Sequence, residues 1–277
     1  MDSGTLALLE SDSHVVAPLN YIGRTDRKPF TYAGTPPAGQ PQRFAPLEPR
    51  RVMIQDGRPL AERFTLDAEG FRFRRHETAV ADFYDDAAVE AGYYPEMERL
   101  VAEETGAARV LVFDKTIRTF THTRPDGSPA REPVHRVHND YTVKSAPQRV
   151  RDLLPEEAEA LLARRYAFVN VWRPIRGPLE QYPLALADAG SLGEEEIVAS
   201  DLIYPDRVGE TYAVRYSPRH RWFYFPRMTA GEVVLIKCFD SDPARARFSA
   251  HTAFEDPNTP ADPLPRESIE IRTIAFF

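Results

Sequence analysis

The chain has 277 residues, 42% hydrophobic and 28% charged, which is enough apolar material to bury one large core. Its formal net charge of -7 argues against a nucleic-acid partner, because such proteins usually carry a basic excess that neutralises phosphates. The single cysteine, Cys238, excludes an intramolecular disulfide and a cysteine-based zinc site. No signal-peptide pattern and no apolar run of membrane-spanning length is found, so we expect a cytoplasmic protein without a membrane partner.

The first 120 residues predict a mixture of extended segments and helix. We expect residues 1–50 to form an extended, proline-rich arm, followed by strands in "PRRVMIQDGR" and "RFTLDAEGFRFRRHET". Residues 82–107 have the apolar spacing of a helix, and Thr105–Gly106 is a stop signal. "ARVLVFDKTIRTF" then reads as a buried strand that continues into a more polar one.

The second half predicts one helix followed by many short strands. "LPEEAEALLARR" (154–165) has Pro155 at the expected first helical position and carboxylates in the first turn. From residue 166 onward, β-branched and aromatic runs alternate with Pro, Gly, Asp and Ser, which is typical of an antiparallel double sheet. The predicted fold is mainly β with flanking helices, a jelly roll. We expect a single domain over 1–277, with 1–110 as arm and helices packed on the sheet and 111–277 as the core.

The stretch "VHRVHNDYT" (134–142) contains the first candidate metal ligands. His138 and Asp140 are two residues apart, so on a strand their side chains point the same way. Two histidines and one carboxylate form the facial triad that holds iron(II) in oxygenases, and only His220 and His251 follow Asp140. We prefer His251, in the strand-like "FSAHTAFEDP", because His220 lies in a turn among arginines. The alternative is that these histidines are ordinary packed or surface residues.

The last predicted strand carries a candidate anion clamp. "RESIEIRTIAFF" places Arg266, Ser268, Glu270 and Arg272 on one face. An Arg-x-Ser pair suits a guanidinium that holds a carboxylate bidentately while a hydroxyl adds a second bond. In an oxygenase of this class, the carboxylate would be the distal one of 2-oxoglutarate. The alternative is an edge strand that bears solvated charges.

Long sequence blocks add a family resemblance that covers nearly the whole chain. "HNDYT", "NVWRPI", "RWFYFPRM", "KCFDS", "AHTAFEDP" and "RESIEIR" resemble the gibberellin-desaturase and cephamycin-methoxylation group of iron(II)/2-oxoglutarate oxygenases. This resemblance implies a double-stranded β-helix, iron held by His138, Asp140 and His251, and 2-oxoglutarate clamped by an arginine of the last strand. Both arginines of that block are present, so the resemblance does not decide between Arg266 and Arg272. The Arg-x-Ser spacing makes Arg266 our first choice.

The resemblance also implies the reaction: hydroxylation, desaturation or oxidative cyclisation of a small molecule, with 2-oxoglutarate and O2 as co-substrates, in secondary metabolism. Tyr141, Asn170 and Trp172 are further candidates for the pocket, and Arg118 for its mouth. We expect Lys237 and Asp240 to form a buried structural pair. Two alternatives remain: a cupin-like metal dioxygenase without 2-oxoglutarate, and a non-catalytic jelly-roll binding protein. The sequence indicates neither the substrate nor the oligomeric state.

Overall fold

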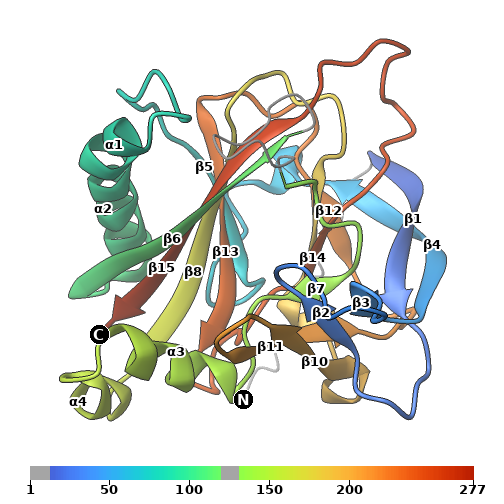
Figure 1. Cartoon of the computed structure of the whole chain (residues 1–277). Helices are drawn as coiled ribbons and strands as arrows, with labels where there is room; N and C mark the ends of the chain where they lie inside the picture. Colours follow the sequence, from blue (N-terminus) through green and yellow to red (C-terminus); the bar gives the residue numbers. More distant parts are fainter. Residues whose placement is uncertain (1–12, 120–130) are drawn as a thin grey trace, which may run out of the picture.

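The computed structural model describes residues 13–119 and 131–277 of the chain. Two β-sheets form the core, and helices cover the outer face of the smaller sheet (Figure 1). This is the predicted mainly β jelly roll with flanking helices. The larger sheet has ten strands in the order β1-β4-β12-β9-β14-β7-β11-β10-β2-β3, and the smaller has five in the order β5-β13-β8-β15-β6.

The strands of the larger sheet are β1 (His14–Ile22), β2 (Phe30–Tyr32), β3 (Arg43–Phe44), β4 (Leu47–Asp56), β7 (His138–Asn139), β9 (Leu184–Ala187), β10 (Ile197–Ile203), β11 (Val208–Val214), β12 (Trp222–Tyr224) and β14 (His251–Ala253). Those of the smaller sheet are β5 (Phe71–Arg75), β6 (Arg109–Thr119), β8 (Tyr166–Pro174), β13 (Glu232–Asp240) and β15 (Glu267–Phe276). Residues before 110 therefore supply strands to both sheets as well as helices.

Alternation along the central strands divides the core into layers. On β8, Phe168 and Trp172 belong to the cluster between the sheets, which also contains Leu186 and Phe223 of the larger sheet. Val169 and Val171 face the opposite way and pack with the helical segment on the outside. Because both faces are covered, β8 and β13 are buried along their whole length, including polar residues such as Asn170 of β8 and Lys237 of β13.

The helical segment that covers the smaller sheet consists of α1 (Asp86–Ala88), a π-helical turn (Val89–Tyr93) and α2 (Tyr94–Thr105). Helix α2 buries Met97, Leu100 and Val101 against the sheet. It ends at Gly106, which adopts a left-handed conformation with φ of 72°. The predicted stop at Thr105–Gly106 is confirmed, because glycine takes this conformation without the steric penalty of a Cβ atom.

Two shorter helices differ from the sequence-based expectation. The helix predicted over 154–165 spans only Ala158–Leu162 (α4), so the expectation that it starts at Pro155 was wrong. The preceding helix, α3 (Ser145–Leu153), was not predicted. Ala146, Val150 and the partly buried Leu153 have the i, i+4, i+7 spacing of one helix face, so the sequence contained a signal for this helix.

Candidate active site

The three predicted metal ligands lie together at the junction of β7 and β14. These strands are antiparallel neighbours in the larger sheet, and His138 is paired directly with His251. Asp140 follows β7 immediately. One ligand atom from each of His138, Asp140 and His251 can be chosen so that all lie within 4.8 Å of one another. Side chains that lie far apart in the sequence thus form one potential metal site.

Backbone hydrogen bonds orient both imidazoles. Nδ1 of His138 lies 2.9 Å from the carbonyl oxygen of Arg136, and Nδ1 of His251 lies 3.2 Å from that of Ser249. A ring nitrogen that faces a carbonyl carries the proton, which leaves Nε2 as the lone-pair donor on each ring. Burial, reinforced by the neighbouring His251, lowers the pKa of His138 to about 3. His138 is therefore neutral at physiological pH, the state in which it can bind a metal ion.

Asp140 is held by two side chains of the opposite sheet. Asn170 Nδ2 on β8 donates to its Oδ2 at 2.8 Å, and Arg272 Nε on β15 donates to the same oxygen at 3.3 Å. Burial alone would raise the pKa of Asp140, but Arg272 and the two histidines hold it well below its usual range. The carboxylate is therefore ionised, and its Oδ1 is on the side of His138 Nε2, 3.6 Å away.

The two candidate clamp arginines have very different surroundings. Arg272 bonds to Glu270 at 2.6 Å, Asp114 at 2.9 Å and Asp140, so its charge is already compensated. Arg266 has no carboxylate partner among the described residues. Its Nε donates to Ser268 Oγ at 3.1 Å and its Nη1 to the Tyr182 carbonyl at 2.6 Å, while its guanidinium lies 5.1 Å from the Trp172 ring centroid. Burial, together with the charge of Arg118, lowers the pKa of Arg266 to about 9.

One cavity joins these groups. It is lined by His138, Asp140, His251, Arg266, Arg272, Trp172, Arg118, Glu270, Val134, Leu184 and Ala253. Arg118 thus lines the cavity as expected, whereas Tyr141 does not: its ring packs on Phe168 with a centroid separation of 4.2 Å. Asn170 reaches the site only through Asp140. Glu270 also lines the cavity and was not predicted to have a role there, although its place on the same strand face as Arg266 and Arg272 indicated it.

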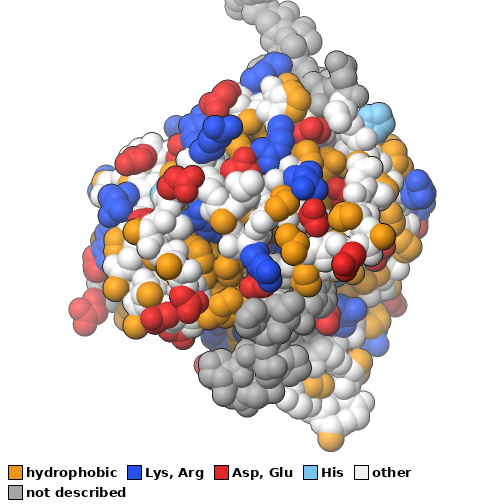
Figure 2. Space-filling view, turned by 90° about the horizontal axis from the view of Figure 1, so that it is seen from above, with side chains coloured by type: hydrophobic (Ala, Val, Ile, Leu, Met, Phe, Trp, Pro, Cys, Tyr) orange, Lys and Arg blue, Asp and Glu red, His pale blue; other side chains and the backbone are white. Residues whose placement is uncertain are grey.

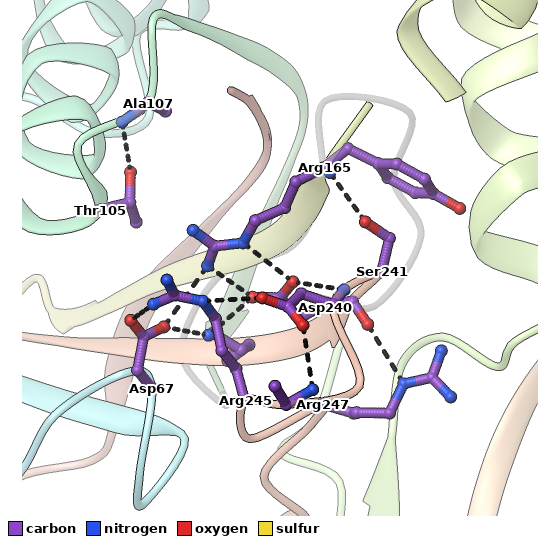
Figure 3. Close-up of polar contacts among 12 residues, drawn as sticks. Asp67, Thr105, Ala107, Arg165, Asp240, Ser241, Arg245 and Arg247 are labelled. Carbon is purple, nitrogen blue, oxygen red and sulfur yellow. Dashed lines mark hydrogen bonds and ion pairs between the residues drawn. The ribbon is translucent and has the colours of Figure 1, made fainter. Parts of the chain in front are cut away.

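Two other sequence features belong to the framework. Lys237 is buried and bonds to Asp240 at 2.8 Å and Asp67 at 2.7 Å, which confirms the expected Lys–Asp pair. Arg165 also reaches Asp240, so this carboxylate is shared by two cations (Figure 3). His220, the rejected ligand candidate, bonds through Nε2 to Glu196 at 2.8 Å. Its imidazole is thus engaged away from the three candidate ligands.

A jelly roll with two histidines and one carboxylate converging beside an arginine that no described carboxylate compensates is the arrangement of a non-haem iron oxygenase. A family model named YDMC, described as an oxidoreductase/YMDC permease-like domain, matches residues 19–276. The Fe(II)/2-oxoglutarate-dependent dioxygenase nvfI of Aspergillus novofumigatus is 32% identical over 257 residues, covering 88% of this chain and 90% of that protein. The hydroxylase/desaturase CTB9 of Cercospora beticola is 32% identical over 253 residues, covering 83% and 77%.

The fold comparison agrees with the sequence comparison. A solved structure of the iron and alpha-ketoglutarate-dependent endoperoxidase NvfI superimposes with a TM-score of 0.86 and 28% identity, covering 96% of this chain and 99% of that one. The chain therefore belongs to the Fe(II)/2-oxoglutarate-dependent dioxygenase family, within the group that the YDMC model describes. It is an oxidoreductase that uses iron(II) and 2-oxoglutarate. The resemblance to the gibberellin-desaturase and cephamycin-methoxylation group is confirmed at this broader level.

The charge distribution on the surface and the length of the helices are relevant to nucleic-acid and membrane partners. Basic and acidic side chains are interspersed on the face shown in Figure 2, without a single-sign field over it. Within residues 13–119 and 131–277, no helix is both long and apolar enough to cross a membrane.

Proposed function

We propose that the chain oxidises a C–H bond of a small organic molecule, with His138, Asp140 and His251 as iron ligands and Arg266 and Ser268 as the 2-oxoglutarate clamp. The observation that carries this proposal is the convergence of the three donors, within 4.8 Å, on the cavity that Arg266 also lines. When bound, iron(II) activates O2 and couples oxidation of the substrate to conversion of 2-oxoglutarate to succinate and carbon dioxide.

The donor set fits iron(II). Two imidazole nitrogens and one carboxylate oxygen are the ligands of a facial triad, and they leave positions open for 2-oxoglutarate and O2. The hydrogen bonds to the two backbone carbonyls fix the rings in a ligating orientation, and Asn170 and Arg272 fix the carboxylate. Such outer partners raise ligand basicity and maintain geometry before the metal binds.

The surroundings of Arg266 fit the distal carboxylate of 2-oxoglutarate. Its Nη2 has no hydrogen-bond partner among the described residues, so it is available to an anion, and Ser268 is fixed beside it by a hydrogen bond. Trp172 supports the guanidinium plane. Arg272 is the weaker candidate, because an anion there would compete with three carboxylates.

The names of relatives support the reaction range. They include hydroxylase/desaturases, an endoperoxidase and an aspirochlorine biosynthesis protein of Aspergillus oryzae. We propose a substrate from secondary metabolism, a closer relationship to the gibberellin-desaturase and cephamycin-methoxylation group, and a single oxygenase domain over 1–277. A cytoplasmic location is also part of the proposal, supported by the presence of one buried cysteine and the consequent absence of an intramolecular disulfide.

The test is anaerobic titration of iron(II) and 2-oxoglutarate into the purified protein. Chelation of iron by the keto acid gives a weak visible charge-transfer band at about 500 nm in facial-triad sites. We expect the band in the wild-type protein and in His220→Ala, and its loss in His251→Ala. A band that survives in His251→Ala, or its absence from the wild type, contradicts the assignment.

A further inference from the structure

Arg118 is a second arginine in the candidate active site without a carboxylate partner among the described residues. It lies on β6, paired with Ser268 of β15, and its side chain lines the cavity that contains the three candidate iron ligands. Among the described residues, its guanidinium makes one hydrogen bond, which Nη1 donates to the carbonyl oxygen of Glu132 at 2.7 Å. Arg118 is half-buried, and loss of water lowers its pKa although the charges of Glu270 and Asp140 act in the opposite direction; the charge of Arg118 in turn lowers the pKa of Arg266.

Two arginines that line one cavity without a carboxylate bonded to either among the described residues indicate that anions occupy the cavity during function. A buried charge costs several kcal/mol, on the order of magnitude known for proteins, unless a counter-charge compensates it. The third arginine of the cavity, Arg272, meets this condition through Asp140 and Glu270. Arg118 and Arg266 form no such pair within the part of the chain that the structure describes.

2-Oxoglutarate accounts for only one of these two arginines. One of its carboxylates belongs to the iron chelate and the other to Arg266 in the function proposed above. Iron(II) and the 2-oxoglutarate dianion bring equal and opposite charges, so loading both leaves the net charge of the cavity unchanged. Arg118 therefore still faces the cavity without a paired counter-charge from the described residues when the cofactors are in place.

We propose that Arg118 binds a carboxylate of the primary substrate, which makes that substrate an organic acid. This inference rests on the proposed function, because it assigns 2-oxoglutarate to Arg266. A guanidinium with free N–H groups recognises a carboxylate through paired, charge-assisted hydrogen bonds. Anchoring the acid on β6, across the cavity from the iron ligands of β7 and β14, directs the remainder of the substrate toward the iron.

The experiment uses the anaerobic complex of the enzyme with iron(II) and 2-oxoglutarate. Benzoic, cinnamic, 1-naphthoic and abietic acids are each added beside their methyl esters, and shifts of the visible band report binding next to the iron. Succinate formation in air provides a second readout. The variants are Arg118→Met, which removes the charge while keeping length, and Arg118→Lys, which keeps the charge.

We expect at least one acid to bind more tightly than its ester to the wild type, and Arg118→Met to weaken that acid by about tenfold or more. Arg118→Lys should retain part of the preference, and esters should bind both variants as they bind the wild type. Acids and esters that act alike on the wild type, including no effect from either, overturn the proposal. So does Arg118→Met if it weakens 2-oxoglutarate binding itself. Failure of the wild type to form the band would instead overturn the proposed function.

Discussion

Replacement of Arg266 by methionine tests the 2-oxoglutarate site most directly. The change removes the cavity arginine that bonds to Ser268 and has an Nη2 available to an anion, while the linear side chain keeps its packing on Trp172. Each hydrogen bond to a charged group contributes about 1.5–3 kcal/mol, so loss of the two bonds of a carboxylate clamp costs about 3–6 kcal/mol. That corresponds to an increase in the Kd for 2-oxoglutarate of roughly a hundredfold to ten-thousandfold or more.

The assay is titration of 2-oxoglutarate at saturating iron(II), followed by the visible band. Arg266→Lys should recover part of the affinity, because an ammonium keeps the charge but not the planar fork. Arg272→Met is the matched comparison further along the same strand, and saturating iron separates its effect on Asp140 from any effect on 2-oxoglutarate. Unchanged affinity in Arg266→Met, or a larger loss in Arg272→Met, would refute the assignment of the clamp.

Three further predictions concern the supports of the site and the fold. Asn170→Ala removes the 2.8 Å bond to Asp140 and should weaken iron(II) binding by roughly 10–100-fold in a metal titration; an unchanged Kd contradicts a positioning role. Asp240→Asn leaves the buried Lys237 with Asp67 as its remaining carboxylate partner among the described residues and should cost about 1–3 kcal/mol in urea denaturation; a loss below about 0.5 kcal/mol would contradict a stabilising role for Asp240. Glu196→Gln should destabilise the protein above pH 4.5 but progressively less toward pH 2. The pKa of Glu196 is lowered to about 2, because hydrogen bonds from Arg219, the Gly193 backbone and other donors outweigh the effect of burial. The ionised carboxylate therefore stabilises the fold above its unfolded pKa, and this contribution is lost as the pH falls toward 2. Thermal melts that show a constant difference across this window would disprove the linkage.

Local chemistry allowed the candidate iron ligands to be predicted from the sequence. The H-x-D pattern places two side chains on one face, and His251 was the later histidine in a strand-like segment without flanking arginines. Both inferences need only strand alternation and the ligand preference of iron. The same reasoning placed Arg266, Ser268, Glu270 and Arg272 on one face of the last strand, and all of these except Ser268 line the cavity.

The electrostatic difference between Arg266 and Arg272 depends on long-range pairing and could not be predicted in the same way. Arg272 is compensated because β6 pairs with β15 so that Asp114 lies opposite it. Asp140, which bonds to Arg272, and Asn170, which bonds to Asp140, lie in two other parts of the chain. No property of the sequence "RESIEIR" specifies those neighbours. Helix α3 differs in this respect, because Ala146, Val150 and Leu153 have the spacing of one helix face and local reasoning could have predicted it.

A bulge in β6 shows why simple alternation would also have failed on that strand. Arg272 pairs with Asp114, but the next residue of β15, Thr273, pairs with Val112, so Phe113 is an extra residue on β6. The extra residue reverses the phase of β6. Phe113 packs toward the core between the sheets, with its ring 5.9 Å from that of Phe168, while the neighbouring Asp114 still reaches Arg272.

This bulge links the core to the site. Without it, regular alternation could not direct both Phe113 and Asp114 to the same face of the sheet, because adjacent strand residues face opposite sides. The apolar half of β6 would then lose a core contact, or the polar half would turn Asp114 away from Arg272 and Arg118 away from the cavity. Arg272 would lose one of its carboxylates, and Arg118 would no longer meet the substrate. The irregular step in β6 therefore lets one strand serve the hydrophobic core at one end and the charged wall of the active site at the other.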